Sequence, residues 1–168
     1  MRILTGFLMA MSLLAASCAE AETSFPSENL AADLIPQYRN EDGSVCRWEV
    51  IDDVDPAQFE GKDIEFISYL NNGEEFGWGI AGEVMRERAI QLHANLGLVD
   101  AKYILEHQDE IPADLQGKVY IVFPGTLLND FDGNTNVAYS TWDGQYWRLY
   151  FTWLSDIWNG NGRLVRSN

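Results

Sequence analysis

An α+β domain is the fold class that the sequence predicts: a small antiparallel sheet of roughly five strands, about two helices packed on one of its faces, and a C-terminal β-hairpin. Two observations carry this prediction. Two segments with helical hydrophobic periodicity, 81–97 and 99–111, follow one another in the middle of the chain. Strand-like segments stand on both sides of them, and the last two flank Asp143-Gly144, a dipeptide typical of a two-residue hairpin turn. The chain has 168 residues, 46% of them hydrophobic, which suits one domain with its own core.

The N-terminal segment predicts export. Arg2 precedes an apolar run that is short for a membrane span and typical of a bacterial signal peptide. Two processing routes stay open. The lipobox-like LLAASC would end the signal at residue 17 and leave Cys18 lipidated, whereas AEA would end it at residue 21. The first route predicts an outer-membrane lipoprotein, held to the membrane only through its lipid anchor, and the second a periplasmic or secreted protein.

Residues 22–43 are predicted to form a flexible tether, because they are polar and contain two prolines and the turn-like NEDG. The single globular domain is then expected from residue 44 to 168. The chain has two cysteines, Cys18 and Cys46. Since processing would remove or lipidate Cys18, no intramolecular disulfide is expected, and Cys46 is interpreted as a buried, inert thiol.

The strands and helices are expected in a simple order. Strands are predicted at 46–52, 64–70, 118–123, 136–142 and 145–153. The first helix is expected to stop at Gly97 and the second to begin at Asp100 as its N-cap. The first helix is also expected to bury Val84, Ala89, Leu92 and Leu96. Pro124-Gly125 is expected to end the third strand.

The Asp-Gly turn also predicts how the last two strands pair. A two-residue turn places Trp142 opposite Gln145 and Ser140 opposite Trp147. One face then mixes small and large apolar residues, as a packed face requires: Ala138, Ser140, Trp147, Leu149, Phe151 and Trp153. The opposite face is aromatic and hydrogen-bonding: Tyr139, Thr141, Tyr146, Arg148 and Tyr150.

The second of these faces is the predicted ligand-contact surface, with Tyr139, Tyr146, Arg148 and Tyr150 as its binding residues. Tyrosine combines a flat apolar ring with a hydroxyl, which suits stacking on sugars or docking of an extended peptide. Aromatic residues and arginine also dominate interface energetics. The alternative is that the helices cover this face, in which case its tyrosines are core residues with satisfied hydroxyls.

An acidic turn is the one candidate metal site. Asp130, Asp132 and Asn134 alternate as calcium-loop ligands do. Thr135 and Thr141 occupy the positions where an EF-hand needs glycine and a bidentate glutamate, so this is not an EF-hand. Two interpretations remain: a partial calcium site completed by water, or an Asx-type turn whose side chains accept local N–H groups.

The charge of the chain restricts its partners. The formal net charge is −15 and the pI about 4.3, so the chain repels phosphate backbones and no nucleic-acid partner is expected. A nucleophile elbow, a P-loop, a dinucleotide fingerprint and a zincin motif are all missing from the sequence. Loop carboxylates such as those of 51–55 and 74–75 are the remaining source of hydrolase chemistry.

The C-terminal part carries several recognisable stretches: VFPGT, an acidic D-x-D-G turn, the Trp-rich WDGQYWRLYFTWL and the ending WNGNGRLVR. In these, residues 104–168 resemble the C-terminal part of uncharacterised bacterial proteins. The resemblance implies a recurring module and no particular activity.

The expected function is that of an exported, non-catalytic interaction module of the cell envelope, whose partner is a protein or a glycan. No cofactor is expected besides the calcium considered above. Two alternatives stay open. One is a carbohydrate-active protein, either a glycan binder or a weak glycoside hydrolase. The other is an inhibitor or immunity-type protein whose acidic surface meets a basic enzyme.

Overall fold

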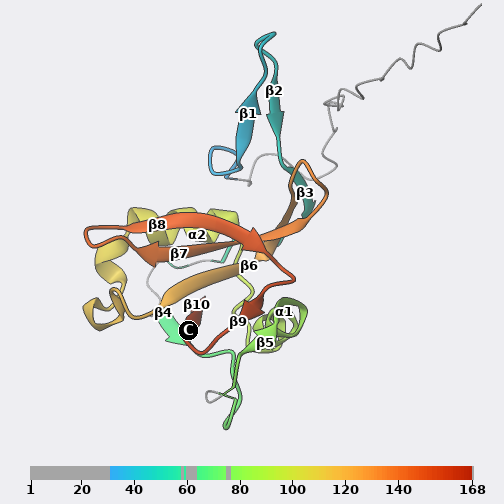
Figure 1. Cartoon of the computed structure of the whole chain (residues 1–168). Helices are drawn as coiled ribbons and strands as arrows, with labels where there is room; N and C mark the ends of the chain where they lie inside the picture. Colours follow the sequence, from blue (N-terminus) through green and yellow to red (C-terminus); the bar gives the residue numbers. More distant parts are fainter. Residues whose placement is uncertain (1–30, 58, 60–63, 75–76, 168) are drawn as a thin grey trace, which may run out of the picture.

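Strand β6 (Tyr120–Asn129) is the longest of the described strands and organises the main sheet. The computed structural model describes residues 31–57, 59, 64–74 and 77–167 (Figure 1). Five strands are hydrogen-bonded in the order β4-β10-β6-β7-β8, and β3 pairs with the second half of β6. Their bounds are Glu49–Asp52 for β3, Ile64–Ile67 for β4, Thr135–Trp142 for β7, Trp147–Trp153 for β8 and Gly162–Ser167 for β10.

The predicted α+β class is confirmed. Every pair in the main sheet is antiparallel except β10 with β6, which is parallel. Two helices stand in the middle of the chain, α1 (Gly82–Gln91) and α2 (Leu98–Glu106). Shorter elements complete the described part: the pair β1 (Gln37–Arg39) and β2 (Val45–Arg47), the pair β5 (Ile80–Ala81) and β9 (Ile157–Trp158), and the 3-10 turns Gln108–Glu110 and Ala113–Leu115.

The helices pack on opposite faces of the sheet, and the expectation that they share one face is wrong. Buried residues of α2 join one core cluster with Ile121, while Met85 and Ala89 of α1 join another with Val122. Successive strand residues point to opposite faces. Since Ile121 and Val122 are both fully buried, both faces of β6 are apolar and each requires its own cover.

The helix boundaries differ from the predicted ones because of Gly97. This residue does not stop α1; it is the N-cap of α2, where Asp100 accepts a hydrogen bond from the Gly97 N–H (Oδ2–N 2.9 Å). Asp100 is therefore inside the first turn rather than at the cap. Burial raises the pKa of Asp100, although the hydrogen bonds that it accepts from the N–H groups of Gly97 and Ala57 act to lower it. In α1, Met85 is buried where Val84 was expected, and Val84 is exposed.

Pro124-Gly125 does not end the third predicted strand. β6 continues to Asn129 through a register irregularity between Phe123 and Leu127. A bulge tolerates proline, which has no N–H to give to the ladder. Gly125 is needed at this point because a Cβ would lie 2.6 Å from Val54 Cγ2 and 2.7 Å from Asn95 O.

Residues 31–43 belong to the fold rather than to a tether. Ala31 and Ile35 are buried in the core cluster of α2, and β1 pairs with β2 in a hairpin that projects from the body of the molecule (Figure 1). The predicted strand 46–52 is divided into β2 and β3 at Trp48. The earlier part of the expected tether, the signal peptide and Cys18 lie outside the described residues.

Cys46 is disulfide-bonded, so the expectation of an inert thiol without a partner is wrong. The side chain is buried as expected, and Asn40 Nδ2 lies 3.3 Å from its sulfur. The prediction rested on loss or lipidation of Cys18 during processing, and Cys18 lies outside the described residues.

The C-terminal hairpin forms, but with a longer turn than predicted. Trp142 pairs with Trp147 and Ser140 with Leu149, so the register is shifted by two residues. Because side chains alternate with a period of two, this shift leaves the predicted faces of the strands unchanged. Asp143 causes the wider turn: its carboxylate accepts the N–H groups of Gln145 (2.9 Å) and Tyr146 (2.8 Å).

Trp147 confirms which face of the hairpin is packed. It is 2% exposed and belongs to the core cluster of α2, together with Ala138. Leu149 and Phe151 pack partly buried against the same cluster, whereas Trp153 at the end of the strand is exposed. Among the residues that the structure describes, no helix has the length and hydrophobicity to cross a membrane.

Candidate ligand-binding surface

The outer face of β7 and β8 is open to solvent near the C-terminal hairpin turn. Tyr150 is 42% exposed and the side chain of Arg148 57%, while Tyr139 is half-buried. On the same side of the sheet, the core cluster of α1 covers Val122, Leu164 and also Val137 of β7, which is fully buried. Tyr146 is also exposed, but it lies in the turn and not on the strand face. Three of the four predicted residues thus share one exposed strand face.

A row of aromatic rings crosses the sheet from this face. The ring of Tyr150 lies 5.8 Å from that of Tyr139, and Tyr139 lies 6.1 Å from Tyr120, almost at right angles (81°). Tyr120 in turn lies 6.0 Å from Trp158. All these distances are within the range of attractive aromatic pairs. The row therefore joins the predicted surface on β8 to the β9 segment, which the sequence analysis did not include.

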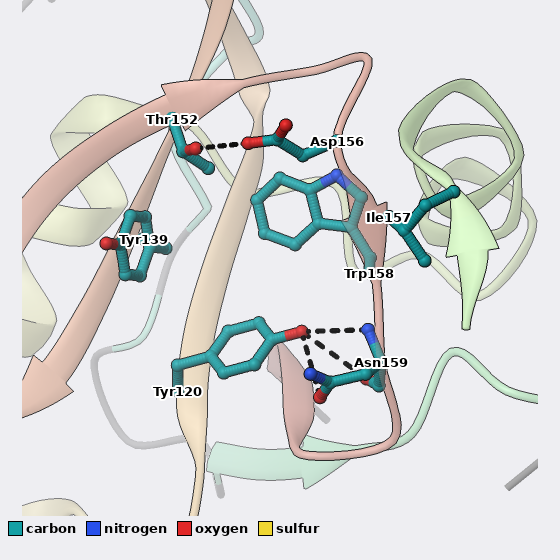
Figure 2. Close-up of a pocket in the computed structure, with 7 residues that line it drawn as sticks. All are labelled: Tyr120, Tyr139, Thr152, Asp156, Ile157, Trp158 and Asn159. Atoms are coloured by element: carbon teal, nitrogen blue, oxygen red, sulfur yellow. Dashed lines mark hydrogen bonds between the residues drawn. The ribbon is translucent and has the colours of Figure 1, made fainter. Parts of the chain in front are cut away.

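The row leads into a pocket of about 190 Å³ between the sheet and β9 (Figure 2). Strands β6, β7 and β8 supply one wall, and the β9 segment supplies the other. Figure 2 shows Tyr139 facing Trp158 across the opening, with Tyr120 along the side opposite Thr152 and Asp156. The lining residues are Tyr120, Tyr139, Thr152, Asp156, Ile157, Trp158 and Asn159.

Hydrogen bonds fix the walls of this pocket. The Tyr120 hydroxyl lies 2.9 Å from that of Tyr69 and accepts the Asn159 N–H (3.1 Å). Burial raises the pKa of both Tyr69 and Tyr120, so both phenols are neutral at pH 7. Trp158 is 3% exposed, and its indole N–H donates to the Leu154 carbonyl (3.3 Å). Hydrogen bonds and core packing within the protein therefore fix the positions of the aromatic walls.

Asp156 is the charged group of the pocket. Its Oδ2 accepts a hydrogen bond from Thr152 Oγ1 at 2.5 Å, and the residue is half-buried. The ion pairs between described residues all lie elsewhere. Asp156 therefore has no ion-pair partner among the described residues, although the charge of Arg163 acts on the Tyr120 wall of the pocket.

Arg148 already has an ionic partner. Its Nε donates to Asp143 in the turn, and this hydrogen bond is the main reason why the pKa of Asp143 falls to about 2. The same pairing raises the pKa of Arg148. An exposed ion pair of this kind contributes little stability, so Arg148 can exchange Asp143 for a ligand group at small cost.

The acidic turn has the geometry of an Asx-type turn. Asp130 Oδ1 accepts the N–H groups of Asp132 (3.0 Å) and Asn134 (2.8 Å), and Oδ2 accepts the side-chain amide of Asn136 (3.2 Å). Burial opposes ionisation of Asp130, but these hydrogen bonds outweigh it and lower its pKa to about 2. Within the described ranges, no three His, Cys, Asp or Glu side chains are grouped to hold a metal ion.

Loop carboxylates considered as hydrolase candidates are engaged in the fold. Asp52 pairs with Arg86, and Glu74 accepts two hydrogen bonds from Arg88, at 2.5 and 2.9 Å. Asp53 accepts the hydroxyl of Thr126. These carboxylates contact different partners, and none of them lines the pocket described above.

No local sequence pattern indicates the pocket, because β9 is too short to give a periodic signal. A tryptophan and a tyrosine from distant segments, Trp158 and Tyr120, meet only in the folded chain. The one available signal is Trp158 itself, a large ring within the polar, glycine-containing stretch WNGNG. Comparison of the chain with protein-family models, curated proteins and solved structures found no match. The resemblance of residues 104–168 to other bacterial proteins stays a prediction.

Proposed function

We propose that the protein is an exported, non-catalytic binding module that holds a glycan or protein of the bacterial cell envelope on the aromatic surface of β7 and β8. The row Tyr150, Tyr139, Tyr120 and Trp158, which ends in a pocket, is the observation that supports this function most directly. The row runs from the exposed Tyr150 through the half-buried Tyr139 and Tyr120 to the buried Trp158. Such rings provide a contact area that loses little conformational entropy on binding.

The rigidity of the surface supports a binding role. Tyr139 and Tyr150 stand on paired strands, opposite one another in the register. Tyr120 and Trp158 are held by hydrogen bonds and by the core. A preorganised surface avoids the cost of ordering side chains when a ligand binds.

Tyr150→Ala and Arg148→Ala test the proposal, singly and together. The ligands to assay are purified peptidoglycan fragments and envelope polysaccharides, and binding is measured by calorimetry or by co-sedimentation. We expect the double variant to bind at least about tenfold more weakly, as for loss of central interface residues. Tyr38→Ala is the matched control, because Tyr38 is an equally accessible tyrosine (57% exposed) on the β1–β2 hairpin. Unchanged binding by the double variant would place the contact surface elsewhere.

A second candidate function follows from the charge. A net charge of −15 favours a basic protein as partner, as in an inhibitor or immunity-type protein. Ionic strength distinguishes the two functions. Association with a basic enzyme should slow steeply between low and physiological salt, whereas stacking of a neutral glycan on tyrosines should change little.

A further inference from the structure

We infer that the pocket of Tyr120, Tyr139, Trp158 and Asp156 binds a methylated or quaternary ammonium group. This inference rests on the proposed binding function and names the chemistry of one part of the ligand. Asp156, Trp158 and Tyr120 lie outside the contact surface that the sequence predicts. The pocket is thus a subsite with its own recognition chemistry beside the exposed face of β8.

Three aromatic rings form the walls of this site. Tyr139 and Tyr120 are almost perpendicular (81°), and Trp158 is tilted by 52° from Tyr120. Figure 2 shows the three rings around the opening, with Asp156 and Thr152 at the remaining side. The face of an aromatic ring carries negative electrostatic potential, and rings that surround a small cation attract it. Tryptophan and tyrosine are the best residues for this purpose.

The carboxylate supplies the counter-charge. Thr152 donates its hydroxyl to one oxygen of Asp156 and so fixes the orientation of the group. Lysine, arginine and histidine are missing from the residues that line the pocket. Together with the net charge of −15, this makes the pocket attractive to a cation and unfavourable to an anion.

The hydrogen-bonding groups of the pocket favour an ammonium ion over a sugar. A pyranose ring requires several free donors and acceptors around it. The Tyr120 hydroxyl is already bonded to Tyr69 and Asn159, and the Thr152 hydroxyl to Asp156. Asn159 Oδ1 accepts the N–H of Asn161 (2.9 Å). The Tyr139 hydroxyl and the side-chain N–H groups of Asn159 remain beside the ring surface and the Asp156 carboxylate. Of these groups, the rings and the carboxylate match a weakly hydrated cation.

The experiment compares choline with 3,3-dimethylbutan-1-ol, a neutral molecule of the same shape in which carbon replaces the charged nitrogen. Binding to the purified chain is measured by calorimetry or by NMR titration. We expect saturable binding of choline and binding of the neutral molecule that is at least about tenfold weaker. Equal binding of the two, or no saturable binding of choline by the folded protein, would overturn the inference.

Variants locate the site. Tyr139→Leu removes a wall and Asp156→Asn removes the charge, and each should weaken choline binding several-fold, whereas Tyr139→Phe keeps the ring and should retain it. Asp132→Asn is the control for a carboxylate outside the pocket, since Asp132 does not line it. Wild-type affinity in both Tyr139→Leu and Asp156→Asn, or displacement of choline by a neutral monosaccharide, would contradict an ammonium site.

Arg148→Ala separates this inference from the proposed function. Arg148 does not line the pocket, so the variant should bind choline as the wild type does and still lose affinity for the envelope ligand. If Asp156→Asn loses choline binding but still captures the envelope ligand fully, the ammonium site is supported and is not needed for that capture. If the wild-type protein captures the envelope ligand through Arg148 and Tyr150 but does not bind choline, the ammonium site is overturned and the proposed function is not.

Discussion

The side-chain amide of Gln108 forms two hydrogen bonds with the backbone of Trp147: it accepts from the N–H (2.7 Å) and donates to the carbonyl (3.0 Å). A neighbouring strand would make the same pair of bonds. β8 is the last strand in the hydrogen-bonded order of the main sheet, so its outer edge is an unpaired one. Gln108 therefore occupies backbone groups of Trp147 that could otherwise pair with a strand of another molecule.

Replacing Gln108 should destabilise the protein and expose this edge. Gln108→Ala leaves the N–H of the buried Trp147 without its acceptor, which costs about 1–3 kcal/mol of unfolding free energy. Urea denaturation followed by tryptophan fluorescence measures the loss. Gln145→Ala is the matched control, because the side chain of Gln145 bonds only to the Tyr146 hydroxyl at the surface. Equal stabilities of the two variants would show that the two hydrogen bonds between Gln108 and Trp147 contribute nothing to the free energy of unfolding.

The two tryptophans at the ends of β8 should differ sharply in their contribution to stability. Trp147 is 2% exposed, and its replacement by alanine should cost about 3–5 kcal/mol. Trp153 is 51% exposed, and Trp153→Ala should cost less than about 1 kcal/mol. Chemical denaturation of both variants in parallel decides this. A larger loss for Trp153→Ala would mean that the packed and open faces of the hairpin have been exchanged.

Acid should weaken the two turns on either side of β7. In the folded protein, the pKa values of Asp130 and Asp143 are about 2, below the ordinary value of 3.8. The stabilisation from each carboxylate is therefore complete well above pH 4 and is lost as the pH falls towards 2. Thermal unfolding between pH 5 and about pH 2 should show a smaller acid-induced fall in Tm for Asp143→Asn than for the wild type.

Asp132→Asn serves as the control for this acid effect, because the hydrogen bonds of its turn converge on Asp130. The acid-dependent fall of Tm in Asp132→Asn should follow that of the wild type. Parallel pH profiles for wild type and Asp143→Asn would mean that the paired carboxylate does not contribute to the acid response.

Calcium should leave the Tm unchanged at millimolar concentration. The Asp130 carboxylate is engaged by N–H donors from Asp132, Asn134 and Asn136, and a cation would have to displace these donors. Differential scanning fluorimetry with calcium and with excess chelator makes the comparison. A concentration-dependent rise in Tm that disappears in Asp132→Ala would instead establish a partial calcium site, because a ligand of the folded state stabilises it by mass action.

Cys46 should resist alkylation until a reductant is added, because it is disulfide-bonded. Mass spectrometry of the protein after treatment with iodoacetamide, with and without dithiothreitol, measures this directly. The chain has one other cysteine, Cys18, and a lipidated Cys18 has no thiol left to form a disulfide. Alkylation of Cys46 without reductant would contradict the bond, and detergent partitioning of the same sample would then test the lipid anchor.

Local patterns were sufficient to predict the class of the fold and the faces of the hairpin. A shift in register by two residues leaves each side chain on the same face of its strand. The predicted faces of Ala138, Ser140 and Trp147 are therefore correct although the turn is longer. The length of the turn depends on Asp143, whose carboxylate accepts two N–H groups. These hydrogen bonds favour the longer turn over the two-residue turn, and the Asp-Gly dipeptide alone does not indicate that they form.

Contacts between distant segments were not predictable in the same way. Gly97 has the sequence signature of a helix end, yet it begins α2, where the hydroxyl of Thr126 on β6 accepts the N–H of Leu98. The pocket depends on β9 lying against β6, which no local pattern specifies. Exposure of Tyr150 likewise follows from the separation of the two helices onto opposite faces.

The position of β10 affects when the protein can fold. β10 lies between β4 and β6, yet the ribosome makes it after every other strand of the sheet. Until it emerges, β4 has no neighbour in the main sheet and the first half of β6 lacks one of its two. Pairing of such distant segments slows folding, because long loops must close first. The main sheet is therefore completed only after the last strand has been made, a property that would suit the export proposed above, because export requires an unfolded chain.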